Sequence, residues 1–472
     1  MTKQILSLVL SVLLLFSLCA CNSSATPETT EEPLVLKVGY AREDITPSTP
    51  VPMGGYGNSH NRISEGVAYP LYATCIAFTY GEEKLLLFTQ DLINSSWTGQ
   101  ARMAITSATG VPADRIMVCA THTHHTPDQG SKDERIAKYQ IQYLTAMTKA
   151  AVAALKDCSP ATLSAGKTET EGLNFVRHYL LSDGTYGGDN FGDFNANTIV
   201  GHATEGDPQM IVLKADREGN KKDIAIVNWQ AHPCKTEGGS KNRLLSPDFI
   251  APMRTYFEYN AGMHFAYFTG AAGNQNTSTR IQSENNYLSF DELGAELAKV
   301  AMSALENATQ LPSDGIRSVI EEREFPTNRE KVDQLAQAVE VVALWQGGAN
   351  TTEANKLARK YGMSSVYEAS AIRSRVNRAP TAKYELNAIC VGGWAFVTAP
   401  YEMFTNMALW VKKDSPFDYT MVFSCANGAN GYFATEAAYD YFSYEGTTSR
   451  FARGCAEDSA QRMLELLNSL KQ

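Results

Sequence analysis

The segment Arg115–Gly130 reads RIMVCATHTHHTPDQG and joins a short apolar run directly to a group of three histidines. The run over 115–120 is short and continuously apolar, which is typical of a buried strand. The stretch 134–158 behind it keeps apolar residues at three- and four-residue spacing, which predicts an amphipathic helix. A strand, a polar loop and a helix in this order indicate the α/β class.

The same alternation continues along the chain in both directions. Strands are predicted over 34–47, 73–92 as a pair around a turn at 81–83, 223–233, 264–273 and 385–400. Helices are predicted over 98–110, 290–308, 329–346 and 449–472, and a loop is predicted over 347–354. No repeat of fixed period is visible. We therefore expect an α/β fold of mixed β-sheets layered with helices, in a single catalytic domain over 34–472.

The composition narrows the class of partner. The 472 residues carry a net charge of -10, whereas a protein that neutralises nucleic-acid phosphates needs a basic face. We therefore expect no nucleic-acid partner. The seven cysteines beyond Cys21 are widely spaced and form no Cys-x-x-Cys pair, so neither a disulfide framework nor a cysteine zinc motif is indicated. Outside the cell, one or two disulfides among these cysteines are still an alternative.

The first 21 residues have the pattern of an export signal, with an early Lys3 and an apolar run too short to span a membrane. The end of this segment, Leu18-Cys19-Ala20-Cys21, resembles a bacterial lipobox, in which Cys21 carries the lipid. The alternative is an ordinary signal peptide. Residues 22–33 are polar and acidic and are predicted to form a flexible tether. We expect an exported protein, lipid-anchored to the outer face of a bacterial cell membrane.

Histidines and a carboxylate follow three different apolar runs. His122 and His124 are two residues apart, so an extended segment places both on one face and His125 on the other. His232 follows the strand predicted over 223–231, and Glu402 follows the strand that ends near Pro400. Zinc takes histidine and carboxylate ligands, often from separate strand ends. A hydrogen-bonded histidine cluster and a carboxylate in the first turn of a helix remain the alternatives.

Seven segments, in order along nearly the whole mature chain, resemble the catalytic domain of the neutral/alkaline non-lysosomal ceramidase family. Those segments are VGYAREDITPSTPVPMGGYG (38–57), ATHTHHTP (120–127), NFVRHY (174–179), VNWQAHPCKT (227–236), LLSPDFIAPM (244–253), APYEMFT (399–405) and NGYFATEAAYDYFSYEGTTS (430–449). The first resembles the Val-Gly-x-x-x-x-Asp-Ile-Thr start of that family, and the second its Ala-Thr-His-Thr-His motif. Members of the family are zinc-dependent N-acylsphingosine amidohydrolases.

The resemblance implies one zinc ion per chain, with its ligands at the positions His122, His232, Glu402 and Tyr432. It also implies that His124 lies close to the metal and that Arg177 is an active-site residue. For the Tyr432 position, the interval from Glu402 is shorter here than in the family. Three nearby tyrosines compete for it, or serve packing: Tyr439, Tyr441 and Tyr444.

The sequence departs from the family at two places. Where the family has a serine in its active site, the stretch GNQNTS (273–278) has Asn276. Asn276 orients substrate or water, or it only structures its loop. The family also continues into an immunoglobulin-like domain, whereas the sequence ends soon after its tyrosine-rich stretch. Both departures weaken ceramide as the expected substrate more than they weaken amide hydrolysis.

The expected reaction is the hydrolysis of an N-acyl bond in a small molecule or a lipid, by water that the zinc ion activates. Arg177 and the metal would stabilise the oxyanion, and His124 or a nearby carboxylic acid would protonate the leaving amine. The rival interpretations are a hydrolase of another small N-acyl or ester substrate, and a non-catalytic lipoprotein that binds a metal or lipid.

Overall fold

A group of four strands with the same order of pairing occurs three times in the described part of the protein. The computed structural model describes residues 34–56, 62–188, 194–346 and 351–471. Residues 35–472 form one compact unit. In the first group, β1 pairs with β3 and β3 with β4 in antiparallel fashion, whereas β4 and β5 are parallel. The strands of this group are β1 (Lys37–Asp44), β3 (Tyr72–Tyr80), β4 (Glu83–Gln90) and β5 (Ile116–Ala120).

The second and third groups repeat this order of two antiparallel pairings followed by one parallel pairing. The second group contains β6 (Ser159–Glu169), β11 (Gln209–Arg217), β12 (Ile224–Trp229) and β14 (His264–Thr269). The third contains β17 (Ile316–Pro326), β18 (Thr381–Val391), β19 (Trp394–Thr398) and β21 (Tyr419–Phe423). A short β1–β6 pairing joins the first two groups into one sheet, to which β16 (Thr309–Leu311) adds through β6. The third group is a separate sheet.

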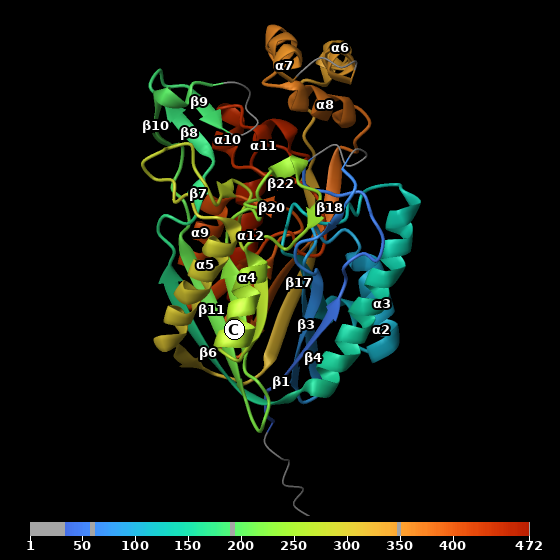
Figure 1. Cartoon of the computed structure of the whole chain (residues 1–472), viewed down its shortest axis with the longest axis vertical. Helices are drawn as coiled ribbons and strands as arrows, with labels where there is room; N and C mark the ends of the chain where they lie inside the picture. The colour runs from blue at the N-terminus through green and yellow to red at the C-terminus, as the bar shows by residue number, and fades with distance from the viewer. Residues whose placement is uncertain (1–33, 57–61, 189–193, 347–350, 472) are drawn as a thin grey trace, which may run out of the picture. The chain divides into compact units, whose positions relative to one another are not determined.

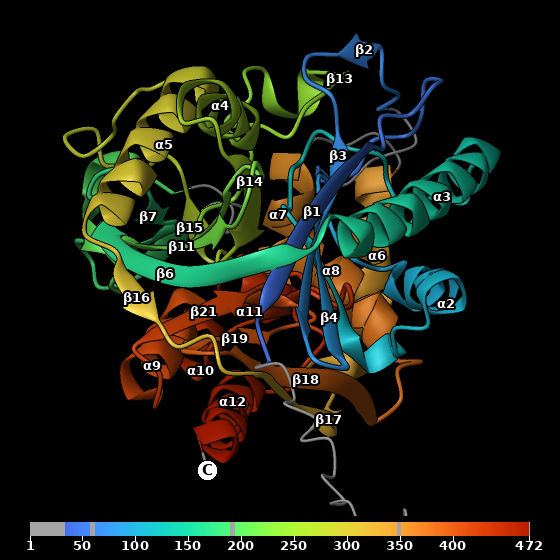
Figure 2. The same ribbon diagram turned by 90° about the horizontal axis from the view of Figure 1, so that it is seen from below.

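Each strand group is covered by helices on one face and packs against the other groups on its opposite face. One buried cluster combines residues of all three groups, among them Val38, Ile226 and Phe396. Three further clusters place helices on the outer faces. Figure 2 shows these pairs of helices outside the strands. They are α2 (Thr98–Thr109) with α3 (Glu134–Asp157), α4 (Ile250–Thr255) with α5 (Phe290–Glu306), and α9 (Thr405–Asp414) with α12 (Cys455–Lys471).

Local sequence explains where the long helices begin. The Asp133 side chain accepts a hydrogen bond from the Arg135 amide and caps α3, whose apolar residues recur at helical spacing on its buried face. Ser289 and Glu292 form a capping box at the start of α5. The predicted α/β class with mixed sheets is therefore confirmed. The last helix begins at Cys455 rather than at residue 449, after a Gly-containing turn.

Parallel pairing brings the functional segments to one edge. All residues of β5, β12 and β19 are buried, and the strands are apolar except for Asn228 and Thr398, so they do not alternate between apolar and polar residues. Strands that run parallel end at the same edge of their sheet. Backbone hydrogen bonds then join the segments after the strands of different groups. Ala120 donates to the Cys425 carbonyl at 3.1 Å, and Ser424 donates to the Thr269 carbonyl at 2.9 Å.

Smaller elements cover this edge. Three helices, α6 (Leu335–Gln346), α7 (Thr351–Lys360) and α8 (Val366–Arg375), share a core of their own. Figure 1 shows them at the same end as the short strands β20 and β22. The remaining short elements are β2 (Gly66–Val67), β7 (Phe175–Val176), β8 (His178–Leu181), β9 (Tyr186–Gly188), β10 (Ile199–His202), β13 (Leu244–Leu245), β15 (Gln275–Asn276), β20 (Glu402–Met403), β22 (Tyr432–Phe433), α10 (Glu436–Asp440) and α11 (Tyr444–Thr448).

The predicted loop over 347–354 is wrong from Thr351 onward, where α7 begins. Ala354 and Ala358 are one helical turn apart and both are buried against α6 and α8, so tertiary packing stabilises a helix in a polar segment. The helix predicted over 329–346 begins only at Leu335, after a 3₁₀ turn over Val332–Gln334. Among the described helices, none combines the length and the apolar character that a membrane crossing requires.

A buried ion pair fixes the segment after β4 to α4. Arg254 Nη2 lies 2.9 and 2.8 Å from the two carboxylate oxygens of Asp91, and both side chains are almost fully buried. We predict that Arg254→Met lowers the free energy of unfolding by about 3–5 kcal/mol, because it leaves a buried carboxylate without its cation. Urea denaturation followed by tryptophan fluorescence measures the change.

The matched control is Arg243→Met, which removes the partner of Glu65 in an exposed ion pair at 2.8 Å. Exposed pairs contribute less than about 1 kcal/mol, so this variant should unfold close to the wild type. Equal unfolding midpoints for the two variants would show that the Asp91–Arg254 pair does not stabilise the fold.

Candidate metal centre

His122 lies two residues after β5 with its backbone in the left-handed region, at φ +66°. A non-glycine residue there is strained by roughly 1–3 kcal/mol, and such residues cluster at functional sites. The Nδ1 atom lies 2.6 Å from the Ile93 carbonyl oxygen. A carbonyl only accepts, so this contact assigns a proton to Nδ1, and in the neutral imidazole Nε2 is then the nitrogen with the lone pair that a metal needs.

His232 repeats this arrangement after β12. Its Nδ1 atom lies 3.0 Å from the Gln275 carbonyl oxygen, and its side chain is almost fully buried. The second ring nitrogen, Nε2, is again left with its lone pair. A backbone carbonyl on the far ring nitrogen is the usual support of a metal-binding histidine, since it fixes the ring and the tautomer.

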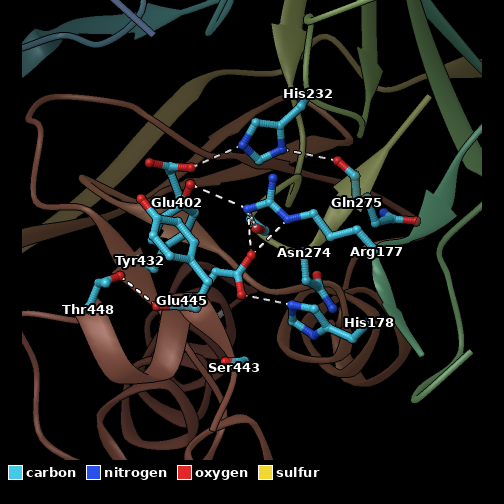
Figure 3. A network of polar contacts seen from close by, with 12 residues as sticks. Arg177, His178, His232, Asn274, Gln275, Glu402, Tyr432, Ser443, Glu445 and Thr448 are labelled. Carbon is cyan, nitrogen blue, oxygen red and sulfur yellow. Dashed lines mark hydrogen bonds and ion pairs between the residues drawn. The ribbon is translucent and has the colours of Figure 1, made fainter. Parts of the chain in front are cut away.

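Glu402 joins the two histidines. Its Oε2 atom lies 3.3 Å from Nε2 of His122 and 3.3 Å from Nε2 of His232. Ligand atoms about 2.0–2.1 Å from one tetrahedral zinc ion would be separated by about 3.3 Å, so this spacing fits such an ion. The ring centroids of the two histidines are 4.9 Å apart. Figure 3 shows His232 and Glu402 directed toward each other from separate segments.

His124 is also part of the cluster. Nitrogen atoms of His122, His124 and His232 all lie within 4.8 Å of one another, so these three residues could hold a metal ion. Both ring nitrogens of His124 are buried without a hydrogen-bond partner in the described part of the chain. His122 and His232 therefore belong to two possible sets of three ligands, in which the third member is Glu402 or His124. We refer to His122, His232 and Glu402 as the triad. His125 faces elsewhere, with Nε2 3.2 Å from the Gly239 carbonyl oxygen.

The electrostatics suit a cation. Burial would raise the pKa of Glu402, but His122 and His232 outweigh it and hold that pKa well below its usual range. Burial lowers the pKa of His232, as does Arg177, and burial together with the other two histidines lowers that of His124 well below its usual range. Burial also opposes a charged His122, yet Cys425 and Glu402 raise its pKa well above the usual value. A carboxylate and neutral imidazoles are the forms that bind metals, so a cation bound here would have to displace a proton from His122.

Arg177 is held beside the centre by a carboxylate that sequence reasoning missed. Its Nε donates to Glu445 Oε1 at 2.7 Å, its Nη2 donates to the Gly273 carbonyl at 2.9 Å, and Glu445 is fully buried. Glu445 Oε2 also lies 2.8 Å from His178 Nε2. Burial would raise the pKa of Glu445, but His178 and Arg177 hold it at about 2. Two features of the sequence could have pointed to this pair: Glu445 lies in the tyrosine-rich stretch, and His178 directly follows Arg177.

Tyr432 lies beside Glu402, because β20 and β22 pair in parallel with these two residues in register. Its hydroxyl oxygen accepts a hydrogen bond from Arg177 Nη2 at 3.3 Å. Burial raises the pKa of this phenol well above its usual value, and Glu402 adds to the effect. The phenol is therefore neutral in the absence of a cation, and its role as a ligand stays a prediction.

The competing tyrosines have other contacts. The Tyr439 hydroxyl donates to the Phe451 carbonyl at 2.7 Å in a buried position, and the Tyr441 hydroxyl lies 3.0 Å from His178 Nδ1. Tyr444 packs edge-on against Tyr432 with the ring centroids 5.8 Å apart.

Asn276 is buried in β15, directly after the residue whose carbonyl holds His232. Antiparallel pairing of β15 with β7 places it opposite Phe175, two residues before Arg177. The same segment approaches Glu402 closely at Gly273, where a Cβ atom would lie 2.7 Å from the Glu402 carbonyl oxygen. Glycine is therefore required there. The catalytic role of Asn276 remains a prediction, and Cys21 lies outside the described residues.

A cavity of about 740 Å³ opens onto His122, Glu402 and Tyr432. Its walls come from α6, α8, the segment Gly428–Gly431 and the residues around α11. Another cavity of about 750 Å³ lies between β9, α7 and α10 and contains none of the triad residues. The 740 Å³ cavity is therefore the one of these two that contacts the candidate centre, and its volume is in the range of small-molecule sites.

No protein-family model matches the sequence, and no curated protein matches it. Solved structures match the fold, and two of them are ceramidase structures. The neutral ceramidase from Pseudomonas aeruginosa matches with a TM-score of 0.68 and 17% sequence identity, covering 93% of this chain and 75% of that chain. A ceramidase complexed with C2 matches with a TM-score of 0.67 and 17% identity, over the same shares. The resemblance predicted from the motifs is thus confirmed at the level of the fold: the chain has the fold of neutral ceramidase.

Proposed function

We propose that the protein is a zinc-dependent amide hydrolase that cleaves an N-acyl bond. The observation that carries this proposal is the single Glu402 oxygen placed 3.3 Å from Nε2 of both His122 and His232. The fold of neutral ceramidase supports it, because two of the solved structures that share the fold are ceramidases. His122, His232 and Glu402 would hold the ion, with Tyr432 as fourth ligand.

A bound zinc ion would lower the pKa of water and polarise the amide carbonyl. The protein supplies the remaining functions. Arg177 is fixed by the buried Glu445 carboxylate and by the Gly273 carbonyl, so its guanidinium is preorganised to stabilise an oxyanion. His124 or a nearby carboxylic acid would give a proton to the leaving amine. Burial and the other two histidines hold the pKa of His124 well below its usual value, so a protonated His124 would release its proton readily.

A second candidate is hydrolysis of a smaller N-acyl or ester substrate rather than ceramide. The observation that favours it is Asn276, which stands where the family has a serine hydroxyl. A lipoprotein that binds a metal or lipid without catalysis is the remaining alternative. The buried Arg177–Glu445 pair argues against it, because a preorganised guanidinium beside the centre has no evident use in metal storage.

We predict that the purified protein binds one zinc ion per chain and that His122→Ala and His232→Ala each abolish this binding. Each substitution removes one Nε2 atom of the triad. Tyr432→Phe should weaken binding about tenfold or more if the phenol oxygen is a ligand. Equilibrium dialysis with metal analysis measures the stoichiometry and the affinity.

The control is His202→Ala, because His202 lies outside the cluster, with Nδ1 on the Val176 carbonyl oxygen and Nε2 on the exposed Glu284. It should retain one ion per chain. Stoichiometric zinc in the double variant His122→Ala/His232→Ala would disprove the site.

We predict that Asn276→Ala lowers turnover only modestly, whereas His122→Ala abolishes it. The reason is that Asn276 does not supply the nucleophile. Loss of a donor to the transition state costs roughly 10²–10³ in rate, so a loss of that size would instead show that Asn276 contacts the transition state. The measurement is kcat and KM on ceramide and on a short N-acyl compound. Asn276→Ser should raise ceramide hydrolysis only if ceramide is the substrate.

We also propose that Cys21 carries a lipid and anchors an exported protein. The lipobox-like sequence supports this, together with the polar segment 22–33 that follows. More than one acyl chain is needed for stable anchoring. Cys21→Ala should move the protein from the membrane fraction to the soluble fraction on cell fractionation. Retention of that variant in membranes washed with high salt would contradict the anchor.

A further inference from the structure

Two arginines line the cavity that contains the metal centre. Arg378 and Arg450 are both among its lining residues, together with His122 and Glu402. Arg378 Nη1 lies 3.3 Å from the Arg450 carbonyl oxygen, which brings the two residues side by side. Arg450 is exposed and Arg378 is half-buried, so the pair lies toward the open side of the cavity.

Neither guanidinium has a carboxylate partner in the described part of the chain. Arg378 donates to the Ser374 hydroxyl at 2.9 Å and to the Arg450 carbonyl, and ion pairs elsewhere occupy the nearby Glu330 and Glu445. Burial lowers the pKa of Arg378, and the adjacent Arg450 and Arg375 add to this effect. Like charges held together in one cavity repel each other, and an oxyanion between them would relieve the repulsion.

The rest of the cavity suits an apolar chain. Trp345, Tyr367, Tyr444 and Tyr432 form a continuous series, with successive ring centroids 6.0, 5.4 and 5.8 Å apart. This series runs from α6 to the residue beside Glu402. The helix α8 contributes a second wall at helical spacing, through Tyr367, Ser370, Ala371 and Ser374. The small residues of this wall leave space for a flexible chain beside the aromatic rings.

We propose that Arg378 and Arg450 bind an oxyanion on the amine portion of the substrate, so that the preferred substrate is an N-acyl amino acid or N-acyl sulfonate rather than a neutral lipid. This inference rests on the proposed amide hydrolysis and names the substrate class for it. The acyl chain lies along the aromatic series, the amide reaches Glu402 and the histidines, and the anionic group stays at the arginines. Hydrolysis would release a fatty acid and an amino acid or an aminosulfonate.

The test compares ligands that differ only in charge. N-octanoylglycine and N-octanoyltaurine carry a carboxylate and a sulfonate, and N-octanoylglycinamide is their neutral match. Calorimetry gives Kd for each, and initial rates give kcat/KM for each, with ceramide as a further substrate. The anionic ligands should bind about tenfold more tightly than the neutral one, because charge-assisted hydrogen bonds are stronger than neutral ones. The two anions show which oxyanion is preferred.

Arg450→Gln and Arg378→Gln should each reduce the ratio of anionic to neutral affinity, and the double variant should abolish it. Arg378→Lys retains the charge and should keep part of the preference. Arg373→Gln is the control, because Arg373 is exposed on α8 and does not line the cavity. Raising the ionic strength should also weaken the preference, since Arg450 is exposed.

The outcomes separate this inference from the proposed function. Hydrolysis of several N-acyl compounds without any preference for the anions would overturn the inference and leave the hydrolase proposal intact. An anion preference that the double variant loses, without turnover of any substrate, would support the arginine site and overturn the hydrolase proposal. An anion preference that survives in the double variant would overturn the assignment to these arginines.

Discussion

Parallel strands must end at the same edge of their sheet, and the candidate metal centre depends on this constraint three times. Each strand group ends in a parallel pair, β4 with β5, β12 with β14 and β19 with β21. His122 follows β5, His232 follows β12 and Glu402 follows β19, so each group delivers one member of the triad. The common core between the groups fixes the distances among these segments. The site is therefore a consequence of how three similar units pack.

The centre combines groups that are costly to bury without a cation. The Nε2 atoms of His122 and His232 both lie 3.3 Å from the Oε2 atom of Glu402, while backbone carbonyls contact the far ring nitrogens. His232 Nε2 and Glu402 Oε2 are buried without a hydrogen-bond partner in the described residues. A buried polar atom without a partner costs about 1–3 kcal/mol, so the folded protein is less stable for having this cluster. A cation bound only by the folded state would offset that cost. Arg177 lies beside these groups and is hydrogen-bonded to both Glu445 and Tyr432.

Much of the fold and of the candidate site could be predicted from the sequence, whereas other parts of both depend on tertiary packing. Apolar runs before His122, His232 and Glu402 predicted strand ends, and helical spacing predicted α3. The strand order that recurs three times could not be recognised as a repeat in the sequence. Loops and added helices of different lengths separate the strands, so the repeat has no fixed period. Glu445 could not be singled out, since only the fold brings it to Arg177 from 268 positions away. The helix α7 was missed because its buried alanines acquire meaning only against α6 and α8.

The location of the ion tests the account most directly. Crystals of the protein grown with zinc can be measured above and below the zinc absorption edge, and the difference map locates the ion without reference to activity. The account predicts one peak per chain, at about 2.0–2.2 Å from His122 Nε2, His232 Nε2 and a Glu402 oxygen. Absence of a peak at these atoms in zinc-saturated crystals, or a peak bound by other residues, would contradict it.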